Sequence, residues 1–326
     1  MAKPTIHIFA LGGTIAMVPD QHGGARPALS ATDIIAAAPG IDDLANIHAH
    51  DFRSVASANL SFEDLIDLAK EVNALLSDGA DGVVVTQGTD VLEESAFALD
   101  LMVDGGAAIF TGAMRHSGLD GSDGPANLAN AVRLAATIER PVAGALVVMN
   151  GEIHAPSQVR KVHTSRFGAF ASAENGPLGR IDGSGVEWAR SIPQTPNISP
   201  GSISGIARIA YYAAVMDDRS AILQTIADRD FDGLVVAAFG GGHVAEETAD
   251  LLAAMTGNMP IVLASRTGAG RILENVYAYK GAEIDLISRG LIPARNLDAR
   301  KSRVFLTLAL GAGWSLAEIR TAFSKF

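Results

Sequence analysis

The sequence predicts an α/β protein with a mostly parallel sheet. Short apolar runs, which suit strands buried on both faces, alternate with longer stretches in which apolar residues recur at a helical period. That order implies right-handed crossovers from strand to helix to strand. The chain has 326 residues, 48% of them hydrophobic, so it can bury a large core and form two domains.

The expected elements of the N-terminal domain follow this alternation. A first strand covers residues 6–10, and Ser61 caps a helix with a clear apolar face. Asp123-Gly124-Pro125 opens a later helix, because proline lacks only an N–H that the first turn leaves unpaired. Further strands are expected at residues 83–85, 107–111 and 145–149, with a helix over residues 91–103. We expect these strands to form a flavodoxin-like sheet.

The pattern changes after residue 150. Residues 151–188 are polar and irregular, which suggests a hairpin laid over the sheet edge. Residues 191–206 are rich in Pro, Ser, Gly and Asn, which predicts a linker. We therefore expect an N-terminal domain over residues 1–190 and a smaller C-terminal α/β domain over residues 207–326. In the latter, strands are expected at residues 207–211, 234–239 and 261–265, and the last helices near residues 303 and 316.

The composition excludes several partners and chemistries. A net charge of −11 argues against nucleic acid and anionic membrane surfaces as partners. The chain has no cysteine, so disulfides and thiolate chemistry are excluded. No apolar stretch approaches the length of a membrane-spanning helix, and the start leads directly into a strand without a visible signal peptide. A cytoplasmic location fits these features.

Two threonines that follow expected strands suggest a small-molecule site. Gly12-Gly13-Thr14 comes directly after the first strand, and Gln87-Gly88-Thr89 follows the strand over residues 83–85. Ligands of parallel sheets bind beyond the carboxyl ends of the strands, and glycine allows close approach. The alternatives for Thr14 are an ordinary turn or a phosphate loop, although neither glycine-rich phosphate fingerprint is present.

Asp90 and Lys161 are the candidate partners of the second threonine. Asp90 has a structural alternative as a helix N-cap, because Asp90-x-x-Glu93 resembles a capping box. A helix N-terminus also offers free N–H groups to a developing oxyanion. A threonine hydroxyl needs a nearby base, and Lys161 is the candidate, although a surface lysine is the simpler explanation of that residue alone.

The histidines give a weaker signal. His48 and His50 would project from one face of a strand, with Asp51 next to them. No third ligand occurs at helical or hairpin spacing, so we expect no metal site there.

Taken together, the motifs resemble the bacterial L-asparaginase/glutaminase family, the homotetrameric kind with a threonine mechanism. Gly12-Gly13-Thr14-Ile15-Ala16 is similar to the first signature of the family, and Gln87-Gly88-Thr89-Asp90 is similar to the second. Matching segments continue in order, at residues 112–115, 123–128, 147–150, 161, 176–179, 265–270 and 296–303. A single motif would be unspecific, whereas so many in order are highly specific.

The resemblance implies hydrolysis of L-asparagine to L-aspartate and ammonia, without a metal or cofactor. Thr14 would form the acyl-enzyme, while Thr89, Asp90 and Lys161 would activate water or the nucleophile. The family builds each site at an intimate dimer interface within a tetramer. The residues implied around the substrate are Gly13, Ser57, Ala58, Gly88 and the Ala113 region, with His243 and Glu283 from the partner subunit. The alternatives are L-glutamine, a D-isomer or a related amide as substrate, or a weakly active ligand-binding homologue.

Departures from the family pattern surround the first threonine. The family usually has a tyrosine on a lid soon after it, but the first tyrosine of this chain is Tyr211, and the lid segment offers His22 instead. Ala58 replaces a Gln or Glu that contacts the substrate amino group, and His243 stands where a small polar residue is usual. A site that loses a hydrogen-bonding anchor discriminates less well, so we expect a weaker or altered amidohydrolase.

Overall fold

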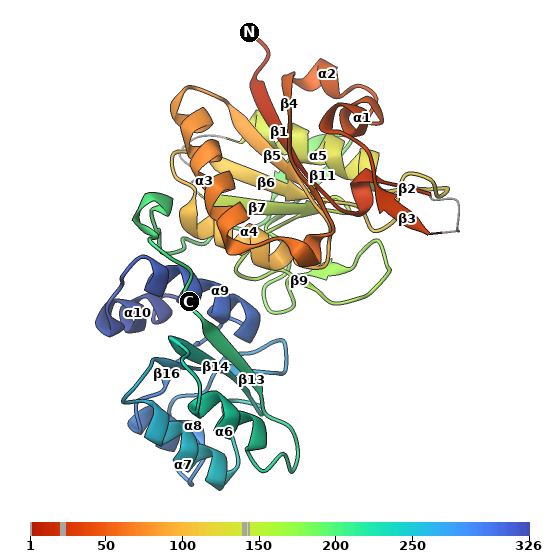
Figure 1. Cartoon of the computed structure of the whole chain (residues 1–326). Helices are drawn as coiled ribbons and strands as arrows, with labels where there is room; N and C mark the ends of the chain where they lie inside the picture. Colours follow the sequence, from red (N-terminus) through yellow and green to blue (C-terminus); the bar gives the residue numbers. More distant parts are fainter. Residues whose placement is uncertain (1, 20–23, 139–141, 143) are drawn as a thin grey trace. The chain divides into compact units, whose positions relative to one another are not determined.

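The computed structural model forms two compact units, Met1–Pro200 and Gly201–Phe326 (Figure 1). It describes residues 2–19, 24–138, 142 and 144–326. Each unit is an α/β structure with its own sheet and its own cluster of buried apolar side chains. The predicted fold class is therefore confirmed.

The N-terminal unit is built on an eight-stranded sheet with the order β12-β11-β8-β7-β6-β5-β1-β4. The parallel strands are β1 (Thr5–Gly12), β4 (Asn46–Val55), β5 (Gly82–Thr86), β6 (Ala107–Thr111) and β7 (Gly144–Met149). Numbered in chain order, they lie in the order 2-1-3-4-5, which is the flavodoxin-like arrangement predicted. The direction of connection reverses between β1 and β5, where such sheets bind their ligands.

Helices cover both faces of this sheet. The helices α3 (Phe62–Ser77) and α4 (Leu92–Met102) lie on one face, as Figure 1 shows. The other face carries α5 (Gly124–Thr137) with the short α1 (Ala31–Ala36) and α2 (Ile41–Leu44). Both predicted helix starts are confirmed: Ser61 forms a capping box with Asp64, and Pro125 lies in the first turn of α5.

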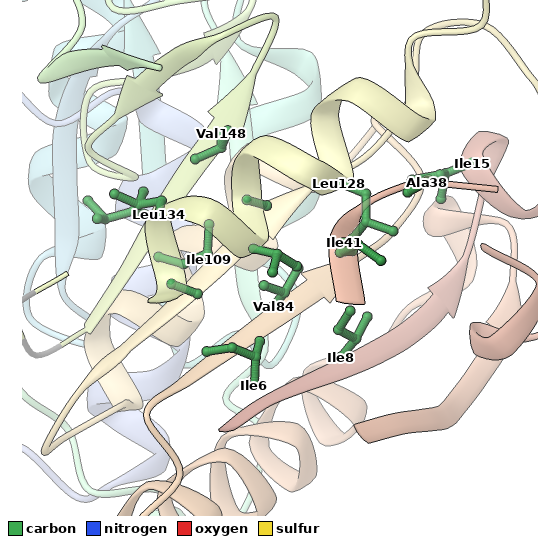
Figure 2. Close-up of a cluster of buried hydrophobic side chains, with 14 of the residues drawn as sticks. Ile6, Ile8, Ile15, Ala38, Ile41, Val84, Ile109, Leu128, Leu134 and Val148 are labelled. Atoms are coloured by element: carbon green, nitrogen blue, oxygen red, sulfur yellow. The ribbon is translucent and has the colours of Figure 1, made fainter. Parts of the chain in front are cut away.

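The core under α5 follows from the period of two along each strand. Ile6 and Ile8 of β1 point to the same face as Val84 and Ile109 of the neighbouring strands (Figure 2). They meet the apolar side of α5, including Leu128 and Leu134, and all six side chains are fully buried. This packing holds the strands in place along the helix, and so determines where their carboxyl ends and the loops that follow them lie.

The chain after β7 forms the predicted hairpin at the sheet edge, and this hairpin extends the sheet instead of lying over it. β8 (Glu152–His154), β11 (Gly179–Asp182) and β12 (Gly185–Trp188) continue the sheet in antiparallel fashion. Pairing with β8 satisfies the backbone groups that β7 would otherwise leave open at its edge. Two small ribbons lie outside this sheet, one of β2 (Met17–Pro19) with β3 (Ala25–Pro27) and one of β9 (Arg160–Lys161) with β10 (Phe170–Ala171).

Residues 191–199 form neither helix nor strand and lie along α4. The N–H of Ile198 donates to the carbonyl oxygen of Leu101 at 2.7 Å, and the Thr195 hydroxyl donates to that of Asp100 at 3.2 Å. The first part of the expected linker is thus packed against the N-terminal unit. The short 3-10 turn η3 (Pro200–Ser202) follows it.

The C-terminal unit has a four-stranded parallel sheet, β13 (Ile209–Ala213), β14 (Gly233–Ala238), β15 (Ile261–Ser265) and β16 (Ile292–Pro293) in that order. Its helices are α6 (Ala221–Ala227), α7 (Glu246–Met255), α8 (Glu283–Ser288), α9 (Ala299–Gly311) and α10 (Leu316–Phe323). The three predicted strands are present within two residues of their expected limits. Helix α9 begins at Ala299, earlier than predicted, because the Asp298 side chain accepts the N–H groups of its first turn.

Asp100 makes the stability of the N-terminal unit depend on pH. It lies in α4, is 8% exposed, and its Oδ1 accepts the N–H of Ala145 at 2.9 Å. Burial raises the pKa of Asp100 to about 7, against the opposing hydrogen bonds from Ala145 and Thr195. Between pH 4 and 7 the folded state therefore holds a proton that the unfolded state has lost, so this group makes stability fall as pH rises through that window.

We expect Asp100→Asn to stabilise the protein more at pH 8 than at pH 4.5. The amide keeps an acceptor for the N–H of Ala145 but cannot ionise, and the gain between the two pH values should be on the order of 2–4 kcal/mol. Urea unfolding at both pH values measures it. The matched control is Asp78→Asn at the exposed C-cap of α3, for which we expect the same change at both pH values. An equal effect of Asp100→Asn at pH 4.5 and 8 would contradict the account.

Candidate active site

Four neighbouring strands deliver the candidate residues to one edge of the sheet. The strands β4, β1, β5 and β6 are adjacent and parallel, so their carboxyl ends meet at the same edge. Each is followed within three residues by a predicted site residue, namely Ser57, Gly13, Gly88 and Ala113 respectively. Thr14 comes directly after Gly13, and Thr89 comes directly after Gly88. The two threonines therefore follow β1 and β5, the strands between which the direction of connection reverses.

The two threonine loops touch through their glycines. Gly13 has a φ of +83°, and a Cβ atom on it would lie 2.1 Å from both Cα and N of Gly88. A Cβ on Gly88 would in turn lie 2.8 Å from Oγ of Ser57, which is 4% exposed. No side chain fits in these gaps, so the glycines permit the close approach of backbone to backbone. The structure thus brings Gly13, Gly88 and Ser57 together, with Thr14 partly exposed at the start of η1 (Thr14–Ala16).

Lys161 joins the second threonine and its aspartate. Its Nζ lies 2.9 Å from Thr89 Oγ1 and 2.7 Å from Asp90 Oδ1. Thr89 is 5% exposed, whereas the Asp90 side chain is 74% exposed and that of Lys161 is 15% exposed. Since β9 places the lysine from a separate ribbon, the contact spans more than 70 residues of sequence. A half-buried amine beside a buried hydroxyl is the arrangement that can move a proton to or from that hydroxyl.

The capping alternative for Asp90 does not hold in this structure. The N-cap of α4 is Val91, and no side-chain hydrogen bond caps the helix. The Asp90 carboxylate instead faces the lysine amine. Its position one residue before the cap still places it near the free N–H groups of the first turn of α4.

The loop after β6 is held by the start of α5. Both carboxylate oxygens of Asp123 accept the N–H of Met114 at 3.0 Å, and Nδ2 of Asn127 donates to the Gly112 carbonyl oxygen at 3.0 Å. Ala113 lies between these anchors and is fully buried. The segment that resembles the family motif Asp-Gly-Pro-x-Asn thus fixes the Ala113 backbone, while its place near an oxyanion stays a prediction.

The structure describes some of the positions that depart from the family pattern, but not all of them. Ala58, in η2 (Ser57–Asn59), is exposed, and its methyl group offers no hydrogen bond. Ser30, the last residue of the segment 17–30 in which the family usually carries its lid tyrosine, is the N-cap of α1 in a capping box with Asp33. His22 lies outside the described residues.

His243 and Glu283 form a pair within the C-terminal unit. His243 Nε2 lies 3.3 Å from Glu283 Oε2, and the His243 ring packs against Tyr277 and Tyr279 with centroids 5.2 and 5.7 Å away. Glu283 is fully buried at the start of α8. Burial alone would raise the pKa of Glu283, but the N–H groups of Tyr277 and Val276, together with His243, outweigh it and lower the pKa. The pair is therefore a carboxylate with a histidine held against it.

The two histidines of β4, His48 and His50, lie beside a third histidine of β1, which the sequence did not reveal. His7 of β1 stacks on His48 and on His50, with ring centroids 4.9 and 5.1 Å apart, and its Nδ1 lies 2.9 Å from Nε2 of His50. The rings are nearly parallel rather than convergent. Among the described residues, no group of three or more His, Cys, Asp or Glu side chains is arranged to hold a metal ion.

Glu93 is a site residue that the sequence suggested only as part of a capping box. It lies in the first turn of α4, is 1% exposed, and accepts the backbone N–H of Lys161 with Oε2. The feature that could have indicated its role is a carboxylate three residues after Asp90, in a helix whose residues are almost all buried. Buried carboxylates are rare and need a partner.

The fold and this arrangement define an α/β enzyme with a lysine–threonine pair at the switch point of its sheet. Comparison with known proteins gives the family. The model "Asparaginase, N-terminal" matches residues 5–194, and "Glutaminase/Asparaginase C-terminal domain" matches residues 208–323. The chain belongs to the asparaginase family.

Relatives and a solved structure agree with this assignment. The chain is 36% identical to a "Probable L-asparaginase" of Deinococcus radiodurans, over 99% of this chain and 98% of that protein. It is 32% identical to "L-asparaginase 2" of Escherichia coli, over 100% of this chain and 94% of that one. A "Probable Cytoplasmic L-asparaginase from Campylobacter jejuni" superposes with a TM-score of 0.87 at 29% identity, covering 99% of this chain and 100% of that chain. None of the helices in the described ranges is long and apolar enough to span a membrane.

Proposed function

We propose that this protein hydrolyses L-asparagine to L-aspartate and ammonia through an acyl-threonine intermediate. The observation that carries the proposal is the position of Lys161 Nζ against Thr89 and Asp90. The loop that carries Thr89 and Asp90 touches the Thr14 loop, where Gly88 meets Gly13. Membership of the asparaginase family supports the substrate class, since relatives along the whole chain are named L-asparaginases.

The proposed reaction has two steps. The Thr14 hydroxyl oxygen attacks the side-chain amide carbon of the substrate, the C–N bond breaks, and the hydroxyl proton leaves with the nitrogen as ammonia. Water then attacks the ester, releases aspartate and returns a proton to Thr14. Lys161 and Thr89 would move the proton in these steps, and Asp90 would hold the lysine amine in place.

The remaining assignments follow the family resemblance. Ser57 and Asp90 are proposed to bind the α-carboxylate and α-amino groups of the substrate, beside Gly13 and Gly88. We propose a homotetramer of intimate dimers, in which a partner subunit supplies His243 and Glu283. The proposed location is the cytoplasm, a word that the name of the Campylobacter relative also carries. Besides the partner subunits, the small amide substrate is the proposed ligand, with no cofactor.

Ammonia release from a panel of amides tests the proposed function. We expect turnover of L-asparagine, with L-glutamine as the second candidate because the C-terminal domain model spans glutaminases as well. The panel should include D-asparagine, D-glutamine and simple amides. Thermal stabilisation by L-asparagine without release of ammonia from any amide would favour a ligand-binding homologue and contradict the proposal.

We expect Ala58→Gln to lower KM for L-asparagine by roughly tenfold to a hundredfold, because a hydrogen bond to a charged group is worth roughly 1.5–3 kcal/mol. The exposed methyl group of Ala58 lies next to Ser57, so a longer polar side chain has room there. Steady-state kinetics measure the effect. Asp67→Gln, an exposed change in α3, is the control and should leave KM unaltered. An unchanged KM in Ala58→Gln would show that the missing anchor is not at this position.

A further inference from the structure

Two acidic residues at the start of α4 hold Lys161, one by its side chain and one by its backbone. The carboxylate of Asp90, just before α4, lies against the Lys161 amine, and Glu93, in the first turn of α4, accepts the Lys161 backbone N–H with Oε2. Glu93 is 1% exposed, whereas the Asp90 side chain is 74% exposed. The buried contact therefore acts on the backbone of the lysine and the exposed one on its side chain.

The lysine needs such an anchor because its own strand is very short. The strand β9 has two residues and pairs only with the two residues of β10. The N–H of Val162 donates towards β10, to the Ala169 carbonyl oxygen at 2.7 Å. Successive N–H groups of a strand point to opposite sides, so the N–H of Lys161 points away from β10, towards α4. Glu93 receives it there, and a two-stranded ribbon of this length would not hold its place alone.

We propose that Glu93 is a positioning residue, which sets the distance between the Lys161 amine and the Thr89 hydroxyl. The inference rests on the proposed function, in which Lys161 moves a proton at Thr89. A hydrogen bond to a carboxylate is about twice as strong as one between neutral groups, so the buried contact fixes the backbone firmly. Because Asp90 directly precedes the N-cap of α4 and Glu93 lies in the first turn of that helix, the amine and the backbone of Lys161 are both held at the N-terminal end of one helix.

The test compares three replacements of Glu93 by steady-state hydrolysis of L-asparagine. Glu93→Leu removes the acceptor, and a displacement of roughly 1 Å should lower kcat by about a hundredfold while KM changes little. Glu93→Gln keeps an acceptor for the Lys161 N–H, so its kcat should stay within about tenfold of that of wild type. Glu93→Asp keeps the charge but withdraws it by one methylene group, and should lower kcat by about tenfold. If the leucine variant does not fold, the aspartate variant decides, and an unchanged kcat in it overturns the proposal. Glu94→Gln, one residue on, is the matched control.

A double-variant cycle separates positioning from general support of the fold. In a Lys161→Met background, where no amine remains to be placed, Glu93→Leu should leave the residual kcat unchanged. The same hundredfold loss in both backgrounds would mean a purely structural role and would overturn the proposal. If wild type hydrolyses no amide, or if Lys161→Met keeps full activity, the proposed function itself fails. If Lys161→Met is inactive while Glu93→Leu matches wild type, only this inference fails.

Discussion

Thr14→Val is expected to lower kcat for L-asparagine by at least about a thousandfold, because it removes the proposed nucleophile while keeping the shape of the side chain. Thr14 lies at the start of η1, partly exposed, directly after the glycine that touches the second threonine loop. Its hydroxyl is replaced by a methyl group of similar volume, so the fold should be retained. Ammonia release under saturating substrate measures the effect, and thermal unfolding reports the stability.

Two controls make the Thr14 result specific. Thr14→Ser keeps a hydroxyl and should retain a measurable part of the activity. Thr137→Val, at the C-terminal end of α5, removes a threonine hydroxyl that donates to the Arg133 carbonyl oxygen at 2.8 Å, and should leave kcat unaltered. Full activity in Thr14→Val would contradict the proposed role of Thr14.

Lys161→Met is expected to lower kcat by about two to four orders of magnitude, which is the usual contribution of a positioned acid or base. The change removes the amine that lies 2.9 Å from Thr89 Oγ1. Stability should change by only about 1 kcal/mol, since the partner carboxylate is mostly exposed and such pairs contribute little. Kinetics and urea unfolding of the same preparation measure both quantities.

Chemical rescue sharpens the lysine prediction. Lys161→Ala leaves space beside Thr89 for a small primary amine, so added ethylamine should restore part of kcat, and the restored rate should increase with amine concentration. The matched control is Lys70→Ala, since Lys70 lies on the exposed face of α3 and its amine lies 3.3 Å from Asp67 Oδ1. Its activity should match wild type with and without ethylamine. Wild-type kcat in Lys161→Met would contradict the role of the lysine.

The sequence was sufficient to predict the sheet and the edge that carries the site. Strands such as β5 are apolar throughout, and glycine and threonine follow them directly, so both the strand and the start of the loop are local features. The helix capped by Ser61 was predicted for the same reason.

Features that depend on contacts distant in sequence were not predicted. Whether residues 152–188 cover the edge of β7 or extend it depends on backbone pairing, which leaves little trace in a polar and irregular stretch. The contact of Glu93 with Lys161 and the stacking of His7 on His48 join segments separated by 68 and 41 residues. The role of Asp90 was open because a capping pattern and a lysine partner look alike in sequence, and only the observed N-cap at Val91 separates them.

The central claim is that the acyl group of the substrate is carried by Thr14. Mass spectrometry of enzyme quenched in acid during turnover of L-asparagine, followed by peptide mapping, tests it most directly. We predict a mass increment of one aspartyl group on the peptide that contains Thr14, and its loss in Thr14→Val. In Thr89→Val any increment should still lie on the peptide that contains Thr14, because the proposed nucleophile is unchanged. An increment on the peptide that contains Thr89, with none on that of Thr14, would contradict the account.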